Sequence, residues 1–312
     1  MQVSFMTEPQ AGGTYDDLLR LARWAETVGF DSFARSDHYL NMDESVPATD
    51  ALTTLAGLGR DTSTIKLTVL VTPLTFRHPG VLAKTAATVD QMSEGRLELG
   101  VGTGWMEPEH ERFGIELPDL WERFRRLYET LAYLRSCFGS QNEGFAGRHY
   151  NLEPMDVLPK ATGDLPIIVG GGGPKKTPSI AGRFADEYNM FTTDTESLRA
   201  RLDVMSAAAV DAGRDPEAIR ISFVGYPVMG DDEADYRDRL AARAASRDME
   251  TGEYEAMLET RNLPHGTAEQ VAEQFAAYAR NGVDRYYVQV YAPLTEIDTD
   301  DVERVFNVIK DT

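Results

Sequence analysis

The sequence has very little cysteine and no long apolar run. Its single cysteine, Cys137, has no partner for an internal disulfide and falls in an amphipathic helical pattern, so we expect a core residue. No apolar run is long enough to span a bilayer, and the first residues lack the basic segment and long apolar stretch of a signal peptide. We therefore expect a cytoplasmic protein that does not insert into membranes.

Positive charge is also scarce. The 312 residues include 51 acidic and 31 basic side chains, of which six are lysines, and the formal net charge is -20 at pH 7. This charge would repel nucleic acids and anionic membranes, and no basic stretch offsets it. Acid-rich, lysine-poor surfaces are typical of proteins kept soluble at high salt, although a GC-rich genome also favours arginine. A small molecule is therefore the expected binding partner.

Short apolar runs alternate with helical patterns along most of the chain. The predicted strands are 3–6, 32–35, 66–71, 97–101, 166–169, 188–191, 219–228 and 285–290. The predicted helices are 14–28, 49–59, 79–92, 119–137, 177–184, 195–212, 267–280 and 299–309. Eight strand-helix units favour an α/β fold, a (β/α)8 TIM barrel formed by one domain over residues 1–312. A doubly wound open sheet is the alternative.

Two segments do not fit this alternation. Residues 138–163 are rich in glycine and lack periodicity, so we predict an insertion after the fourth helix, as a loop or hairpin. Residues 231–262 contain an extra helical pattern before the seventh helix.

The strand at 32–35 stops at an Asp-His pair, Asp37 and His38. In a barrel the loops after all strands lie on one rim, so this pair would meet the loop with Thr103 and Gly104 and the loop of Gly170 to Gly173 there. His38 is a candidate for handling a proton or polarising a substrate, and Asp37 for orienting it or bonding a ring. The alternative is a structural histidine. Metal binding is disfavoured, because no second histidine stands at chelating spacing.

Glycines follow the fifth predicted strand as an unbroken run, Gly170 to Gly173. They expose backbone N–H groups directly before a helix, whose N-terminus favours an anion, so the loop suits a phosphate. Lys175 and Lys176 would add charge to that site. The alternative is a tight barrel turn with solvated lysines.

The segment Gly100-Val101-Gly102-Thr103-Gly104-Trp105 does not have the spacing of a dinucleotide-binding fingerprint. Its small residues would instead admit a flat ring, with Trp105 as a wall. The charged run that follows contains Glu109, a candidate general acid, although such a run is more often a solvated helix start. The chain has no serine or cysteine nucleophile motif.

Together these segments resemble the bacterial-luciferase-like flavin superfamily, and within it the branch that uses the deazaflavin coenzyme F420. The similarity extends over nearly the whole chain. The motifs that carry it are Gly29-Phe30-Asp31-Ser32 followed by Ser36-Asp37-His38, Phe76-Arg77-His78-Pro79, Asp90-Gln91-Met92-Ser93-Glu94-Gly95-Arg96, Gly102-Thr103-Gly104-Trp105 with Glu109, and Gly170 to Pro174 with Ala185-Asp186-Glu187.

The resemblance implies a barrel with the coenzyme at the C-terminal ends of its strands. By the same resemblance, Asp37 contacts the deazaflavin ring and His38 lies near its reactive carbon. A bulge with a non-proline cis peptide in the third strand, at about Val69-Leu70, would support the ring. The end of the coenzyme that carries the phosphate would bind to Gly170, Gly171, Gly172 and Gly173 and to the segment around Asn189 and Thr192.

The chain departs from the glucose-6-phosphate dehydrogenases of this family at two positions. Their active-site tryptophan falls at Met42, and their acidic residue after Gly-Thr-Gly falls at Trp105. Oxidation of a sugar phosphate is therefore not expected, and Glu109 is left as the candidate acid.

Our first hypothesis is an F420-dependent oxidoreductase that transfers a hydride to or from a small organic substrate. The second is an FMN-dependent monooxygenase that receives reduced flavin from a partner reductase. A third is a barrel that has lost its cofactor and binds or assembles other molecules. The resemblance also implies a homodimer.

Overall fold

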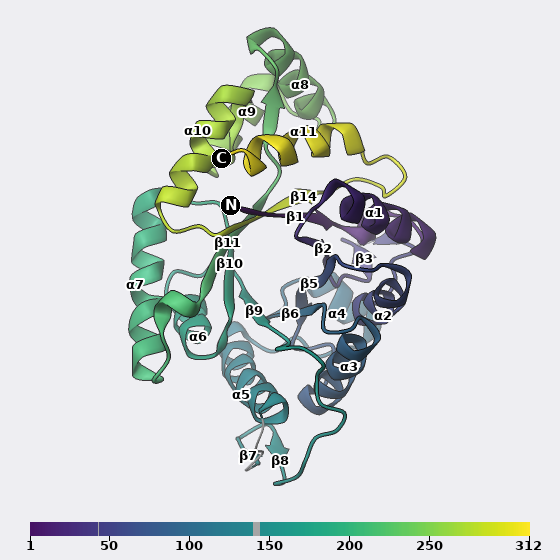
Figure 1. Cartoon of the computed structure of the whole chain (residues 1–312), viewed down its shortest axis with the longest axis vertical. Coiled ribbons are helices and arrows are strands. Elements are labelled where there is room, and N and C mark those ends of the chain that lie inside the picture. The colour runs from purple at the N-terminus through teal and green to yellow at the C-terminus, as the bar shows by residue number, and fades with distance from the viewer. Residues whose placement is uncertain (43, 140–143) are drawn as a thin grey trace.

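The computed structural model describes residues 1–42, 44–139 and 144–312. Within them, eight parallel strands close into a barrel in the order β1-β14-β11-β10-β9-β6-β5-β2 (Figure 1). These strands are β1 (Gln2–Thr7), β2 (Ser32–Arg35), β5 (Lys66–Pro73), β6 (Leu97–Gly102), β9 (Ile167–Gly170), β10 (Glu187–Phe191), β11 (Arg220–Gly225) and β14 (Arg285–Val290). Because β1 pairs with both β2 and β14, the sheet has no free edge. The TIM-barrel prediction is confirmed, and the open sheet is excluded.

Helices follow the strands and surround the barrel (Figure 1). They are α1 (Tyr15–Val28), α2 (Ala51–Asp61), α3 (Pro79–Met92), α5 (Leu120–Phe138), α6 (Lys176–Phe184), α7 (Thr195–Asp211), α10 (Ala268–Arg280) and α11 (Thr299–Lys310). Each begins within two residues of its predicted start. Local capping explains this agreement, because Thr14 and Thr267 form capping boxes with Asp17 and Gln270.

The remaining elements are short or lie in the two extra segments. They are α4 (Glu107–Phe113), two 3₁₀ turns (Pro9–Ala11 and Pro216–Ala218), the pair β3 (Leu40–Asn41) and β4 (Glu44–Ser45), and the hairpin of β7 (Phe145–Ala146) and β8 (Asn151–Leu152). This hairpin belongs to the predicted insertion, of which residues 140–143 lie outside the described residues.

The segment at 231–262 contains α8 (Glu233–Ala245) and α9 (Thr251–Thr260). The strand predicted over 219–228 is two strands, which corrects the prediction. The barrel strand β11 ends at Gly225, and β12 (Val228–Gly230) pairs instead with β13 (His265–Thr267). The physical reason is Pro227, which has no N–H to donate to a continuing ladder.

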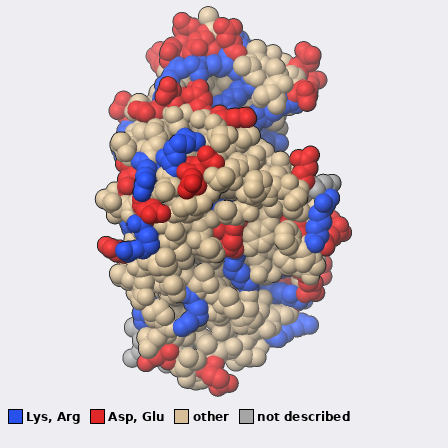
Figure 2. Space-filling model, turned by 90° about the vertical axis from the view of Figure 1, so that its right-hand side faces the viewer, with Lys and Arg blue, Asp and Glu red and all other residues tan. Residues whose placement is uncertain are grey.

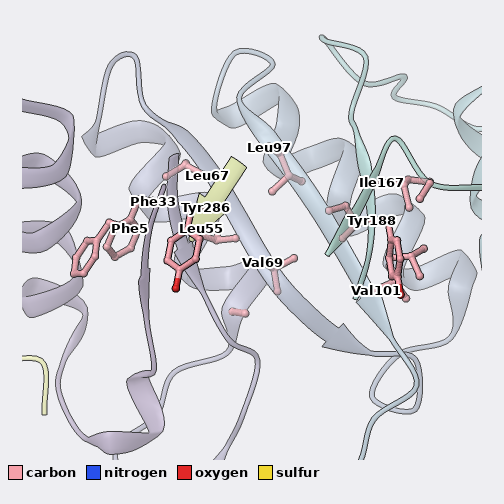
Figure 3. Packing of buried hydrophobic residues seen from close by; sticks show 14 of the residues in the cluster. Phe5, Phe33, Leu55, Leu67, Val69, Leu97, Val101, Ile167, Tyr188 and Tyr286 are labelled. Atoms are coloured by element: carbon pink, nitrogen blue, oxygen red, sulfur yellow. The ribbon is translucent and has the colours of Figure 1, made fainter. Parts of the chain in front are cut away.

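The hydrophobic core has two layers that alternate along the strands. Phe5, Phe33 and Val69 face outward and pack in the large cluster between barrel and helices (Figure 3). Their neighbours Met6, Ala34 and Leu70 face inward and form a second cluster inside the barrel. Cys137 is buried in the outer layer, as expected, and burial raises the pKa of its thiol to about 11. Among the described residues, no helix is both long and apolar enough to cross a bilayer.

A layer of buried charge fills the barrel at the N-terminal ends of its strands. Arg285, at the start of β14, is fully buried, and its Nη1 lies 2.8 Å from Glu98 Oε2 and 3.0 Å from Glu187 Oε2. Its Nε donates to Ser4 Oγ at 2.8 Å, and its Nη1 to the hydroxyl of Tyr287 at the same distance. The inner apolar cluster lies on the strands between this layer and the rim that carries the predicted site.

Candidate functional site

A cavity of about 590 Å³ opens at the C-terminal ends of the barrel strands. Several residues predicted for the site line it: His38, Leu70, Thr103, Gly104, Gly170, Gly171, Gly172 and Asn189. Others do not line it: Asp37, Val69, Glu109, Gly173, Lys175 and Thr192. The three strand-end signals do converge on one rim, as a barrel requires.

The floor of the cavity is formed by an irregularity in β5. Its register with β6 shifts between Val69 and Thr72, and the peptide bond between Leu70 and Val71 is cis. The register shift therefore includes the predicted Val69 and Leu70, while the cis bond falls one residue later than predicted. A Cβ on Gly170 would lie 2.8 Å from Val71 Cγ1, so this strand end needs glycine.

His38 forms a buried pair with Glu109. The Nδ1 of His38 lies 3.1 Å from Glu109 Oε2, and the histidine side chain is 15% exposed toward the cavity. The other carboxylate oxygen accepts hydrogen bonds from the backbone N–H groups of Tyr39 and Leu40. Because a carboxylate can only accept, Nδ1 carries the proton and Nε2 is the nitrogen left for a ligand.

This arrangement corrects the prediction that Glu109 is a general acid. Its side chain is fully buried and does not line the cavity. Burial alone would raise the pKa of Glu109, but the hydrogen bonds from His38 and the N–H of Tyr39 outweigh it, so the pKa is lowered. Glu109 is ionised at neutral pH and cannot supply a proton; its geometry makes it a positioning residue for His38.

Asp37 also departs from its predicted contact with the coenzyme ring. Its Oδ2 accepts from Arg77 Nη1 at 2.6 Å, and its Oδ1 accepts from the N–H of Ala51 at 3.3 Å. Burial would lower the pKa of Arg77, but Asp37 and Asp50 raise it above its ordinary value, so the guanidinium is charged. With both oxygens engaged and 1% of its surface exposed, Asp37 anchors the loop that carries His38.

The glycine loop forms one wall of the cavity. The N–H of Gly171 donates to the carbonyl of Asn189 at 3.1 Å, and nothing lies within 4 Å of the position of a Cβ on Gly172. Helix α6 begins directly after the loop, and Lys175 at its N-cap provides no side-chain hydrogen bond to the helix. Thr192 faces away and donates to the carbonyl of Arg261 at 2.7 Å.

The wall of the cavity that lies opposite the glycine loop was not predicted from the sequence. It comes from three adjacent strands, β14, β1 and β2, and consists of Glu8, Gln10, Ser36 and Gln289. The available signal was Glu8 itself, which follows the end of β1 as Asp37 and His38 follow β2. Applying the strand-end argument to the first strand would have identified it.

Exposed aromatic side chains surround the mouth of the cavity. Trp105 is 61% exposed, Phe191 63% and Tyr291 52%, and all three line the cavity. Trp105 meets the His38 ring edge-on, with ring centroids 5.6 Å apart, as its predicted role as a wall requires. Large exposed rings at the mouth of a cavity indicate a ligand that covers them.

A family model described as "Luciferase-like monooxygenase" matches residues 1–285. The chain belongs to this family. The resemblance noted from the sequence is thereby confirmed at the level of the superfamily. The luciferase-like assignment agrees with a closed barrel whose cavity lies at the C-terminal ends of the strands.

Curated proteins are similar in sequence to part of this luciferase-like chain. An F420-dependent glucose-6-phosphate dehydrogenase of Microbacterium testaceum is 36% identical over 176 residues, 55% of this chain and 52% of that protein. An F420-dependent hydroxymycolic acid dehydrogenase of Mycobacterium tuberculosis is 30% identical over 235 residues, 74% of this chain and 62% of that protein. The chain thus spans between about half and two thirds of the length of these relatives.

A solved structure matches the fold of this luciferase-like chain over nearly its full length. An F420-dependent secondary alcohol dehydrogenase in complex with an F420-acetone adduct has a TM-score of 0.78 and 20% identity. The match covers 99% of this chain and 98% of that chain. At this identity the likeness shows the fold alone.

Proposed function

We propose that the protein is a cytoplasmic F420-dependent oxidoreductase that transfers a hydride between the coenzyme and a small organic substrate. The similarity to curated proteins named F420-dependent dehydrogenases carries the coenzyme assignment. The pair of His38 and Glu109 at a cavity with a glycine wall supports the reaction type. The presence of this pair and of the glycine wall at one cavity speaks against a barrel that has lost its cofactor.

The residues of the glycine wall fit a phosphorylated coenzyme. Gly170, Gly171 and Gly172 line the cavity, with open space where a Cβ of Gly172 would stand. They lead into the N-terminus of α6, whose first N–H groups have no side-chain cap and favour an anion. We assign the phosphate end to this wall and the ring to the floor at Leu70 and Val71.

When bound, F420 supplies a carbon centre that gives or accepts a hydride in two-electron steps. The chain then has to move one proton. The Nε2 of His38 accepts the hydroxyl proton of a substrate being oxidised, or returns it to the oxygen of one being reduced. Glu109 fixes the imidazole through Nδ1 and stabilises its protonated form.

The second candidate function is an FMN-dependent monooxygenase, favoured by the description of the matching family. The first test is a titration of the apoprotein with F420 and with FMN at low and high salt, followed by coenzyme fluorescence. Our proposal expects tighter binding of F420 at both salt concentrations. Preference for FMN would reassign the protein to the monooxygenases, and binding of neither would remove the coenzyme assignment.

We also propose that the protein is a homodimer that associates through α2 and α3. Figure 2 shows wide uncharged areas on the face that carries these helices, which is unusual for a chain with a net charge of -20. Val81, which belongs to α3, is 57% exposed. Val81→Glu is expected to shift the sedimentation coefficient from dimer to monomer. Val210→Glu on α7, where the side chain is 65% exposed, is the matched control and leaves the dimer intact. A wild-type monomer would contradict the proposal.

A further inference from the structure

The cavity contains one buried carboxylate that the proposed reaction does not use. Glu8 follows β1, is 4% exposed and lines the cavity. Among the described residues, it makes no ion pair with a lysine, an arginine or a histidine within 4.0 Å. A carboxylate removed from water is costly unless donors or a cation compensate it. Glu8 therefore lacks the direct ion pair that Glu98 forms with Arg285. The charge of Glu8 does favour the charged form of the buried Arg35, but that guanidinium is hydrogen-bonded to Ser36, Thr49 and Thr54 rather than to Glu8.

Neutral amides hold Glu8 in a fixed orientation. Its Oε2 accepts from Gln10 Nε2 at 2.7 Å, and its Oε1 accepts from Gln289 Nε2. The Oε1 of Gln10 in turn accepts from Ser36 Oγ at 2.9 Å, so the amide nitrogen of Gln10 points at the carboxylate. Each carboxylate oxygen can accept about two hydrogen bonds, which leaves capacity on both oxygens for a ligand.

The charges around the cavity are arranged asymmetrically. The glycine wall, formed by the end of β9 and the loop after it, leads into the uncapped N-terminus of α6, which favours an anion. The wall on β14, β1 and β2 carries the negative charge of Glu8. Among the described residues that line the cavity, none is a lysine or an arginine. An anionic substrate would meet a like charge here with no cation to pair with it.

We propose that Glu8 is a specificity-determining residue that selects small substrates with an O–H or N–H donor, either neutral or cationic, and excludes anionic ones. This inference rests on the proposed function, because it assigns the wall of Glu8 to the substrate and the glycine wall to the coenzyme. It separates this chain from a dehydrogenase of a phosphorylated sugar, which would require cationic side chains near the phosphate. Met42 and Trp105 already set it apart at the sequence level.

The test uses three probes of matched shape: aminomethylcyclohexane as its ammonium ion, cyclohexylmethanol and cyclohexanecarboxylate. Binding is measured by saturation-transfer NMR on the apoprotein and on the protein loaded with F420. We expect the ammonium ion to bind about 10- to 100-fold more tightly than the carboxylate, with the alcohol between them.

Variants of Glu8 assign this preference to the residue. In Glu8→Gln the ammonium and carboxylate probes should bind within about threefold of each other, because a neutral amide replaces the charge. Glu8→Asp keeps the charge and should keep the order. Glu217→Gln, an exposed glutamate before β11 at the other end of the barrel, is the matched control and leaves all three affinities unchanged.

The outcomes separate this proposal from the coenzyme assignment. Equal binding of carboxylate and ammonium by the wild-type protein, or an unchanged order in Glu8→Gln, would overturn the role of Glu8. If Glu8→Gln does not fold, the wild-type order and Glu8→Asp still decide the question. Failure to bind F420 while the apoprotein keeps the expected order would refute the coenzyme and leave the selectivity of Glu8 supported.

Discussion

Arg285→Met should lower the free energy of unfolding by about 3–5 kcal/mol, the usual cost of removing one partner from a buried ion pair. Arg285 is fully buried between Glu98 and Glu187, whose side chains are 1% exposed. Without the guanidinium, two carboxylates remain inside the barrel with weaker compensation. Tyr287 and Thr68 donate to these carboxylates but carry no charge. Two cations remain: Arg220 lies 3.0 Å from Glu187 and 3.8 Å from Glu98, and Lys66 lies 3.6 Å from Glu98. Their side chains are 29% and 44% exposed, so solvent screens them more than it screens Arg285.

The measurement is chemical denaturation of wild type and variant, followed by circular dichroism. Arg280→Met is the matched control, because Arg280 pairs with Glu273 at 2.6 Å while its side chain is 62% exposed. An exposed pair of this kind is expected to leave the midpoint nearly unchanged. Equal effects of the two substitutions would show that the buried layer does not hold the barrel together.

The same ion pair sets the pH dependence of stability. Burial alone would raise the pKa of Glu98, but Arg285, together with the hydrogen bond from Thr68 and the charge of Lys66, outweighs it, so the native pKa lies below the ordinary value of 4.5. The native state then binds fewer protons than the unfolded chain, so this contribution is complete above pH 4.5 and is lost as pH falls through the lowered pKa. Arg285→Met removes the largest of the interactions that lower this pKa, so the pKa rises and we expect a smaller loss of stability on acidification. Denaturation midpoints across this acid range provide the check.

The sequence predicted the barrel because its signals are local. Apolar residues at helical spacing and caps such as Thr14 lie within a few positions of one another, and strand-helix alternation then leaves few topologies. The charged layer could not be predicted in this way. Arg285 reaches partners 187 and 98 positions away, and its strand pattern alone gives no indication that a charge faces the barrel interior.

The candidate site was predictable at strand ends and less so within the loops. His38 and the glycine loop lie on the cavity because a barrel places every such end on one rim. The burial of Glu109 was harder to predict. Helix α4 has only seven residues, which is too short for its sequence pattern to show which of its faces is buried. Asp37 was assigned to a ligand because the sequence does not show that Arg77, 40 positions later, would bind its carboxylate. Glu8 was overlooked although it obeys the same rule as His38.

His38→Ala should reduce kcat by about 10²- to 10⁴-fold, the usual contribution of a positioned acid or base. His38 lines the cavity, and Glu109 engages its Nδ1, which leaves Nε2 for the substrate. The substitution therefore removes the proposed proton carrier and leaves the glycine wall, which we assign to the coenzyme phosphate, unchanged. The affinity for F420, measured by fluorescence titration, should therefore change little. Turnover is followed by the change in F420 fluorescence with a substrate found by screening alcohols and amines.

The control for this substitution is His149→Ala. His149 has the same 15% side-chain exposure and also pairs with a glutamate, Glu122, but lies outside the cavity. Its loss is expected to leave kcat unchanged.

Glu109→Gln should lower kcat as well, because an amide no longer stabilises the protonated ring. The double variant of His38 and Glu109 should be no slower than His38→Ala, since Glu109 acts only through His38. Additive losses would instead mean that Glu109 acts on the substrate by itself, and the assignment of positioning residue would fail.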